Sequence, residues 1–247
     1  MADLPLVLLH AFPVDARMWD GVREPLAART RVVTPDQRGL GRTPLPDSDR
    51  VPTLDDAARD VIALLDKLEL DKVVLGGCSM GGYVTMAMLR AAPERVGGVV
   101  LIDTKAGADT EEASDNRLAM AERVERDGVG WLPDAMLDAL LGDTTRSERP
   151  EVVARVWELI ESQSPAGVAW AQRAMALRRD STETLRALDV PALVVVGEED
   201  GLTRVEEAHA MVDALSKATL EVIPSAGHLA PLENPAAVGE AVLGWLR

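Results

Sequence analysis

The chain has 247 residues and a formal net charge of −15 at pH 7, and 47% of its residues are hydrophobic. This length suits one α/β domain with an insertion, or two small domains, and it supplies enough apolar residues for a large core. The acidic balance argues against nucleic acid and anionic membrane surfaces as partners, because like charges repel. One cysteine and three histidines leave little material for a zinc site.

Six short apolar runs predict β-strands. In chain order they cover residues 4–9, 31–36, 73–76, 96–102, 191–196 and 220–223. Helical spacing follows them at residues 16–28, 53–68, 83–90, 205–215 and 235–245. Strands that alternate with helices in this way predict an α/β fold, with a mostly parallel sheet of about six strands flanked by helices.

The stretch from Thr104 to Asp189 breaks this alternation, because it contains helical patterns and no strand-like run. Helix starts are indicated at Thr110, Pro150 and Ser164. We therefore predict a core domain of residues 1–103 and 190–247, with residues 104–189 inserted after the fourth strand as a helical cap, or lid. A pocket between cap and core would be lined by the inner face of the cap. The large apolar side chains of the cap are Trp131, Met136, Trp157, Trp170 and Met175. We expect most of them to pack against the core domain and one or two of the tryptophans to reach that pocket.

The segment from Gly77 to Gly81 reads Gly-Cys-Ser-Met-Gly and lies between a predicted strand and a predicted helix. In that context, G-x-S-x-G is typical of a nucleophile elbow, with Ser79 at the tip of a sharp turn. The two glycines let the strand and the helix approach closely. The N-terminus of the helix favours the negative charge that develops during acyl transfer.

A serine hydroxyl needs a base to accept its proton, and the base needs an acid to orient it. His10 lies in the first loop and His209 lies inside a helix, whereas His228 follows the last strand. His228 is therefore the candidate base. Asp103 and Asp200 both follow strands, and both remain candidates for the acid.

Five motifs in this order resemble those of the α/β-hydrolase superfamily. They are His10-Ala11-Phe12-Pro13, Asp36-Gln37-Arg38-Gly39-Leu40-Gly41, the elbow, Gly197-Glu198-Glu199-Asp200 and Gly227-His228. The resemblance covers most of the chain outside the cap. Within the superfamily, the short chain is most similar to 3-oxoadipate enol-lactonase-like hydrolases and related small esterases.

The resemblance implies a catalytic triad in which Ser79 is the nucleophile, His228 the general base and Asp200 the acid. It also implies an oxyanion hole formed by the backbone N–H groups of Phe12 and Met80. The family usually has glycine where this chain has Ala11, and we expect the extra methyl group to be tolerated. The strand pair before the first motif is missing, which again predicts a six-stranded core.

Other side chains near these motifs have simpler roles than catalysis. We interpret His10 as a structural hydrogen-bonding group behind the oxyanion loop, and Cys78 as a small inert hydrophobe. His209 is interpreted as a solvated surface residue. We interpret Arg38 as a tie between loops, although a substrate carboxylate is an alternative partner for its guanidinium group.

The predicted activity is hydrolysis of a carboxylic ester or lactone through an acyl-enzyme, with no cofactor and no metal. The alternatives are C–C bond hydrolysis or perhydrolysis by the same triad, and a ligand-binding protein of this fold with little turnover. The substrate would be a small molecule, and the protein a monomer or homodimer with neither nucleic acid nor membrane as a partner. We predict a cytoplasmic location, because Cys78 excludes an internal disulfide and neither a leader nor a membrane-spanning run is visible.

Overall fold

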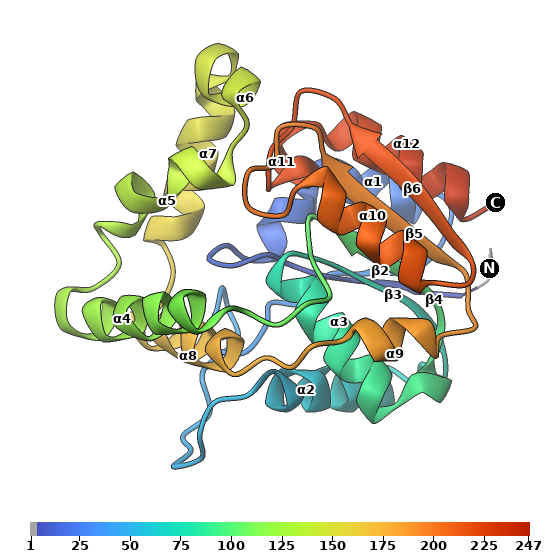
Figure 1. Ribbon diagram of the computed structural model, residues 1–247, viewed down its shortest axis with the longest axis horizontal. Helices are drawn as coiled ribbons and strands as arrows, with labels where there is room; N and C mark the ends of the chain where they lie inside the picture. The colour runs from blue at the N-terminus through green and yellow to red at the C-terminus, as the bar shows by residue number, and fades with distance from the viewer. Residues whose placement is uncertain (1–3) are drawn as a thin grey trace.

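The computed structural model describes residues 4–247, which form one six-stranded sheet (Figure 1). All neighbouring strands are parallel, and their order is β2-β1-β3-β4-β5-β6. The prediction of a parallel six-stranded core is therefore confirmed. The strands are β1 (Leu6–Leu9), β2 (Val32–Val33), β3 (Val73–Cys78), β4 (Val96–Ile102), β5 (Ala192–Gly197) and β6 (Ala218–Ile223).

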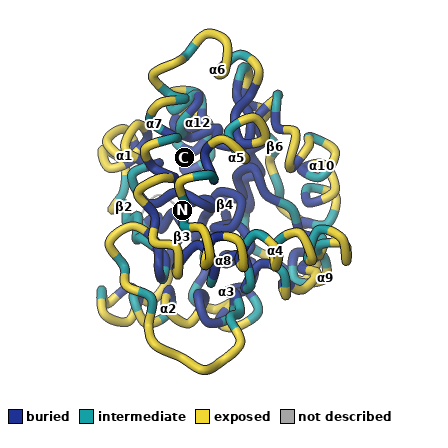
Figure 2. The backbone as a smooth tube through the Cα atoms, turned by 90° about the vertical axis from the view of Figure 1, so that its left-hand side faces the viewer, coloured by how far each residue is buried: buried dark blue, intermediate teal, exposed yellow. Residues whose placement is uncertain are grey.

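The central strands are buried on both faces because helices cover the sheet above and below (Figure 2). Every residue of β1, β3 and β5 is buried, which explains their continuous apolar sequences. The edge strand β6 is buried only in part. Strand β2 has two residues, because Pro35 follows closely and proline cannot donate to a strand ladder.

Helices from distant parts of the sequence cover the two faces. On one face α1 (Asp20–Ala27) packs against α12 (Pro235–Trp245). On the other face α2 (Leu54–Lys67) packs against α3 (Met80–Ala91), below the sheet in Figure 1. Helix α10 (Val205–Ala214) contacts β5 and β6. The sheet is therefore the middle layer of three.

Local sequence signals mark the helix starts. Thr53 and Asp56 form a reciprocal capping box at α2, as the sequence indicates. Thr110 caps α4 (Glu111–Asp127), and Asn234 caps α12. The structure also contains three short helices that the sequence analysis does not separate: η1 (Ala16–Trp19), η2 (Pro93–Arg95) and α11 (Ala230–Glu233).

The chain between β4 and β5 is helical and lies mostly beside the carboxyl ends of the strands (Figure 1). Helix α4 packs on α8, and α5 packs on α7. Helix α9 differs from the others because it contacts α3 and α10 of the sheet layers. The remaining bounds in this segment are α5 (Leu132–Leu140), α6 (Asp143–Glu148), α7 (Pro150–Glu161), α8 (Pro165–Ala176) and α9 (Thr182–Arg186).

Helix α9 falls inside the predicted cap range, although it packs against helices of the sheet layers. The cap prediction covers residues 104–189, and the α4–α8 part of that range makes its main contacts within itself. The division into core and cap stays a prediction. Within residues 4–247, no helix is long and apolar enough to cross a membrane.

Candidate active site

Ser79 lies at a sharp turn between the end of β3 and the start of α3. Its backbone has φ 52° and ψ −112°, which is a conformation that L residues rarely adopt. A Cβ atom at Gly77 would lie 2.2 Å from the carbonyl carbon of Gly81, and one at Gly81 would lie 2.1 Å from the Leu9 oxygen. Both glycines are therefore required by the close approach of strand and helix, and the turn presents the Ser79 side chain at the carboxyl edge of the sheet.

The structure brings Ser79, His228 and Asp200 together although they are distant in the sequence. His228 Nε2 lies 2.7 Å from Ser79 Oγ. On the other side of the ring, His228 Nδ1 lies 2.8 Å from Asp200 Oδ2. All three residues are buried. A hydrogen-bonded chain of hydroxyl, imidazole and carboxylate can transfer a proton away from the serine.

Two neighbouring residues hold the Asp200 carboxylate. The backbone N–H groups of Leu202 and Thr203 donate to Asp200 Oδ1 at 2.8 Å and 2.9 Å. The Thr203 hydroxyl donates to Asp200 Oδ2 at 2.5 Å. Burial opposes ionisation, but His228 and the Thr203 donors outweigh it and hold the pKa of Asp200 below its ordinary value. Asp200 is therefore a carboxylate at neutral pH.

The other candidate acid, Asp103, binds backbone groups. Its Oδ1 accepts a hydrogen bond from the Gly197 N–H at 2.8 Å, and its Oδ2 accepts one from the Ala230 N–H at 3.1 Å. Burial, with the nearby charge of Asp200, raises the pKa of Asp103 well above its ordinary value. No described atom of His228 is within hydrogen-bond distance of the Asp103 side chain. Asp103 therefore ties together the loops around the histidine.

A buried glutamate that the sequence analysis does not identify holds the histidine loop. Glu233 Oε1 accepts hydrogen bonds from the N–H groups of Gly227 and Leu229, at 3.0 Å and 3.1 Å, on either side of His228. Its Oε2 accepts one from Gly142, at the start of α6. The backbone around His228 is thus fixed to the helical segment. Glu233 lies within the helix α11, and no local motif marks it.

The predicted oxyanion donors lie beside Ser79. Met80 N–H is the first of α3 and has no acceptor within that helix, and Phe12 lines the same cavity as Ser79. Neither N–H donates to a protein acceptor among residues 4–247. Ala11 is buried and does not have a positive φ, so alanine is accommodated in this loop.

His10 supports the loop from behind. Its Nδ1 lies 2.9 Å from the Ala11 carbonyl oxygen, and its Nε2 accepts a hydrogen bond from the Gln37 N–H. The Gln37 side chain donates in turn to the His10 carbonyl oxygen. Burial lowers the pKa of His10 despite the Ala11 contact, so the ring is neutral and both nitrogens are occupied. The structural interpretation of His10 is confirmed.

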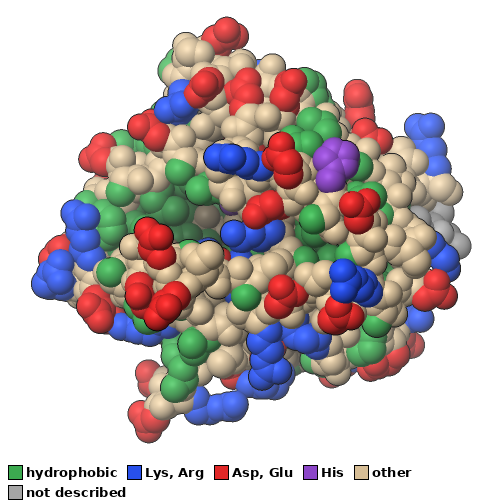
Figure 3. Space-filling model, in the orientation of Figure 1, with side chains coloured by type: hydrophobic (Ala, Val, Ile, Leu, Met, Phe, Trp, Pro, Cys, Tyr) green, Lys and Arg blue, Asp and Glu red, His purple; other side chains and the backbone are tan. Residues whose placement is uncertain are grey.

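A cavity of about 260 Å³ opens onto Ser79 and His228. Its other walls come from Phe12, Tyr83, the loops that contain Lys105 and Thr203, and the helices α4, α5 and α8. Figure 3 shows a hollow on this face, with hydrophobic side chains along its wall and Lys or Arg side chains at its border. The expectation that a tryptophan reaches the pocket is wrong, because its apolar cap lining consists of Ala113, Met120, Met136, Leu140 and Met175.

The tryptophans have other neighbours. Trp170 lies beneath the Arg38 guanidinium group at 5.0 Å, and Trp131 lies 3.7 Å from that of Arg123. Trp157 lines a separate surface depression. A flat aromatic face attracts a guanidinium group, and this attraction accounts for the contacts of Trp170 and Trp131.

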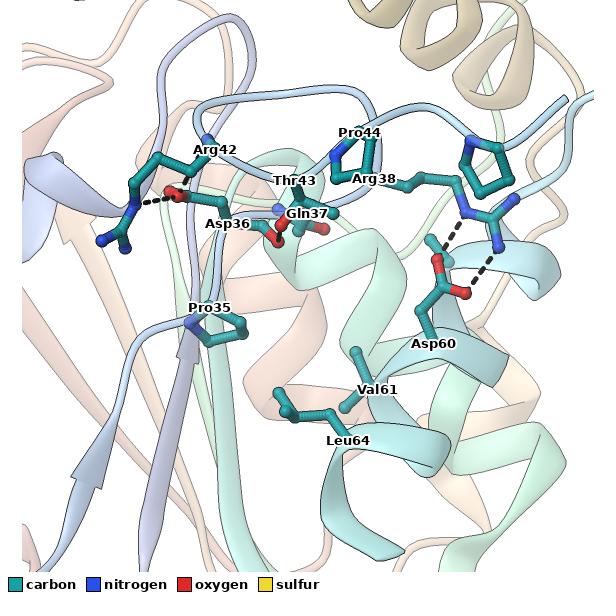
Figure 4. Close-up of a pocket in the computed structure, with 12 residues that line it drawn as sticks. Pro35, Asp36, Gln37, Arg38, Arg42, Thr43, Pro44, Asp60, Val61 and Leu64 are labelled. Carbon is teal, nitrogen blue, oxygen red and sulfur yellow. Dashed lines mark hydrogen bonds and ion pairs between the residues drawn. The ribbon is translucent and has the colours of Figure 1, made fainter. Parts of the chain in front are cut away.

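A second and larger cavity, of about 580 Å³, lies between the 35–46 loop and α2 and contains none of the three triad candidates (Figure 4). Arg38 reaches across it to Asp60, with Nε to Oδ2 at 2.5 Å. Arg38 also donates to the Asp56 carbonyl oxygen. Arg38 is thus a tie between loop and helix, as predicted, and it does not line the cavity at Ser79.

Cys78 and His209 are not placed to take part in a reaction at Ser79. Cys78 is fully buried, and burial raises the pKa of its thiol well above the ordinary value, so it is inert. His209 is exposed on α10. Within residues 4–247, no group of three or more His, Cys, Asp and Glu side chains is placed to hold a metal ion.

Comparisons with known proteins identify the family of the chain. Residues 5–235 match the family described as alpha/beta hydrolase fold, and the chain belongs to that family. It is 27% identical over 242 residues to 3-oxoadipate enol-lactonase 2 of Acinetobacter baylyi, which covers 98% of this chain and 88% of the relative. A thermophilic esterase from Thermogutta terrifontis, solved with malate bound, has a TM-score of 0.95 and 42% identity, covering 99% of this chain and 89% of that one.

A third relative has a different printed activity. The 2-hydroxy-6-oxo-6-(2'-aminophenyl)hexa-2,4-dienoic acid hydrolase of Metapseudomonas resinovorans is 29% identical over 250 residues, which cover 98% of this chain and 83% of the relative. The resemblance to the α/β-hydrolase superfamily is therefore confirmed, and the chain is an α/β-fold hydrolase whose substrate is a small molecule.

Proposed function

We propose that the protein hydrolyses a carboxylic ester or a lactone through an acyl-enzyme on Ser79. The observation that carries the proposal is the continuous chain from Ser79 Oγ through His228 to Asp200, with contacts of 2.7 Å and 2.8 Å. The esterase and lactonase relatives support the same reaction class.

The first half-reaction begins when Ser79 Oγ attacks the carbonyl carbon of the substrate. His228 Nε2 takes the serine proton, while Asp200 holds the Nδ1–H and stabilises the imidazolium. The N–H groups of Phe12 and Met80 donate to the developing oxyanion. The tetrahedral intermediate then collapses, and the leaving oxygen takes the proton from Nε2. An ester releases its alcohol at this step, whereas the alkoxide of a lactone stays joined to the acyl group as a hydroxyl.

Water completes the reaction in the second half. His228 accepts a proton from a water molecule, the water oxygen attacks the acyl carbon, and Ser79 leaves with the proton returned from Nε2. The product is a carboxylic acid, and the enzyme returns to its starting state. No cofactor is required by these steps.

A serine-directed fluorophosphonate tests the nucleophile. We expect wild type to be labelled at Ser79 and Ser79→Ala to remain unlabelled, with hydrolysis of 4-nitrophenyl esters reduced at least about 10⁴-fold in that variant. Ser164→Ala, which removes a serine at the start of α8, is the matched control and keeps both labelling and turnover. A folded wild type that resists labelling would exclude the proposed mechanism.

A panel of esters, lactones and a 1,3-diketone separates ester hydrolysis from C–C bond hydrolysis, the alternative that the dienoic acid hydrolase relative favours. We further propose that the enzyme acts in the cytoplasm as a monomer or homodimer, without nucleic acid or membrane partners. Fractionation and the measured molar mass in solution test these points.

A further inference from the structure

The cavity at Ser79 contains a lysine that the proposed mechanism does not use. Lys105 follows β4 by three residues and lines the cavity together with Ser79 and His228. Its side chain is 26% exposed. The partners of a partly exposed ammonium group on a cavity wall decide its role.

The protein leaves the Lys105 ammonium group without a hydrogen bond. Its nearest carboxylate oxygens are Asp109 Oδ1 at 4.0 Å and Glu207 Oε1 at 3.9 Å, which is beyond hydrogen-bond distance. No other acceptor binds it within the part of the chain that the structure describes. An ammonium group carries three donors, and all three are available to a ligand in the cavity.

Asp109 is already neutralised by two arginines. Arg117 Nε donates to Asp109 Oδ2 at 2.6 Å, and Arg178 donates to Oδ1 at 2.7 Å. Burial opposes ionisation of Asp109, but these two arginines outweigh it and lower its pKa. Asp109 is therefore a fully engaged carboxylate, and it has little capacity left for Lys105.

Lys105, its two nearest carboxylates and the two arginines bound to Asp109 form a cluster with one net positive charge. Lys105, Arg117 and Arg178 stand against Asp109 and Glu207. The whole chain carries −15, so a cationic wall beside Ser79 is an exception to its general charge. A low-dielectric cavity strengthens the attraction of such a wall for an anion.

We propose that Lys105 binds a carboxylate of the substrate, so that the enzyme selects esters or lactones that carry a second, anionic carboxylate group. The ammonium group would donate a charge-assisted hydrogen bond to that carboxylate while Ser79 attacks the ester carbonyl. The methionine-lined remainder of the cavity would hold the carbon chain between the two groups. This inference rests on the proposed function and names the substrate class.

Two matched pairs of esters test the selection, because the carboxylate can lie on either side of the scissile bond. On the acyl side, mono-4-nitrophenyl adipate is compared with 4-nitrophenyl hexanoate. On the alcohol side, 4-acetoxybenzoate is compared with 4-acetoxybenzamide. We expect wild type to prefer the anionic member of at least one pair, and we expect added NaCl to reduce that preference.

Lys105→Met removes the charge and keeps the length of the side chain. We expect it to lower kcat/KM for the preferred anionic ester by about tenfold, mainly through KM, and to change the neutral partner by less than about twofold. Lys105→Arg should keep most of the preference. Lys217→Met changes the net charge equally but lies before β6, outside the cavity, and should leave both esters unaffected.

A binding measurement keeps this inference separate from the proposed function. Calorimetric titration of Ser79→Ala with monomethyl adipate and with dimethyl adipate requires no turnover. We expect tighter binding of the monoanion, and loss of that difference in the double variant Ser79→Ala/Lys105→Met. Hydrolysis by wild type without anionic preference in either pair, or an equal effect of Lys105→Met on both members, overturns the role of Lys105 alone. Absence of hydrolysis and of labelling overturns the proposed function.

Discussion

The two aspartates at the carboxyl ends of β4 and β5 have different surroundings, and these surroundings decide their roles. Asp200 faces His228 and is held as a carboxylate by a hydroxyl and two N–H groups. Asp103 accepts two backbone N–H groups, from Gly197 and Ala230, in a fully buried position. The same residue type is thus placed to orient a base in one position and to hold loops in the other.

The amide substitutions should separate these roles. We expect Asp200→Asn to lower kcat by about 10⁴-fold, because an amide cannot stabilise the imidazolium or keep the required tautomer of His228. Asp103→Asn should keep kcat within about threefold. It should instead lower the free energy of unfolding by about 2 kcal/mol, because the amide NH₂ faces one of the two backbone donors. Steady-state kinetics and urea unfolding of both variants measure these effects.

The same experiment would also identify Asp103 as the acid if that assignment were correct. If Asp103→Asn abolishes turnover while its unfolding curve stays like wild type, and Asp200→Asn remains active, Asp103 is the acid of the triad. Equal losses of activity in both folded variants would mean that the aspartates act as a coupled pair.

The placement of the candidate site residues could be predicted where it depends on order along the chain, and it could not where it depends on packing. Ser79, Asp200 and His228 each follow a strand, and parallel strands bring their carboxyl ends to one edge. Glu233 and Lys105 have no such marker. Their importance follows from which loops and carboxylates the folded chain brings near them, and a single sequence does not contain that information.

At the scale of elements, the elbow depends on how closely β3 and α3 approach. We expect Gly77→Ala to lower the free energy of unfolding by about 3 kcal/mol or more, because its methyl group would meet backbone atoms of Gly81 at 2.2–2.4 Å. Gly239→Ala is the matched control. It lies inside α12, where nothing is within 4 Å of a new Cβ, so we expect it to stabilise the protein by about 0.5 kcal/mol.

Chemical unfolding measured by circular dichroism reports both glycine variants. A Gly77→Ala protein with wild-type stability would show that β3 and α3 can separate without cost, and that the glycine is not needed for the turn. Failure of this variant to yield folded protein, with Gly239→Ala folding normally, would agree with the steric argument.

Element prediction was accurate for buried strands and capped helices, and weaker for short pieces. The stretches at α2 and α12 have both an apolar face and a starting signal, so they could be located. Helix α11 is too short to show a period, and its four residues are fixed by Glu233 and by the Ala230 N–H bond to Asp103. The tryptophan expectation failed because helical spacing indicates an apolar face without indicating which neighbour that face meets.

At the scale of the whole molecule, polar contacts join the helical segment to the sheet layers close to the site. Gln163 Nε2 donates to Asp15 Oδ2 at 2.8 Å, and Gln163 Oε1 accepts from the Gly41 N–H. Thr144 donates to Glu199, next to Asp200. These contacts therefore join the chain around α6 and the end of α7 to the loops that follow β1, β2 and β5.

The hydrogen bond between Gln163 and Asp15 depends on pH, because Asp15 accepts it as a carboxylate. Its side chain is 1% exposed and accepts hydrogen bonds from Arg17 and Gln163. Burial opposes ionisation, but the bonds from Arg17 and Gln163 outweigh it and lower the pKa of Asp15 to about 2. A carboxylate whose pKa is lower in the folded protein contributes stability above its unfolded pKa of 3.8, and that stability is lost as the pH falls toward 2.

We therefore expect wild type to lose on the order of 1 kcal/mol more stability than Asp15→Asn between pH 4.5 and pH 2, measured by urea unfolding at each pH. The amide cannot titrate, so its contribution is the same throughout. Other aspartates with lowered pKa values, such as Asp36 and Asp109, titrate in both proteins and cancel in the difference. Asp47→Asn, at an exposed position, should follow wild type. Parallel losses in wild type and Asp15→Asn would show that ionised Asp15 does not contribute to the stability of the protein above pH 4.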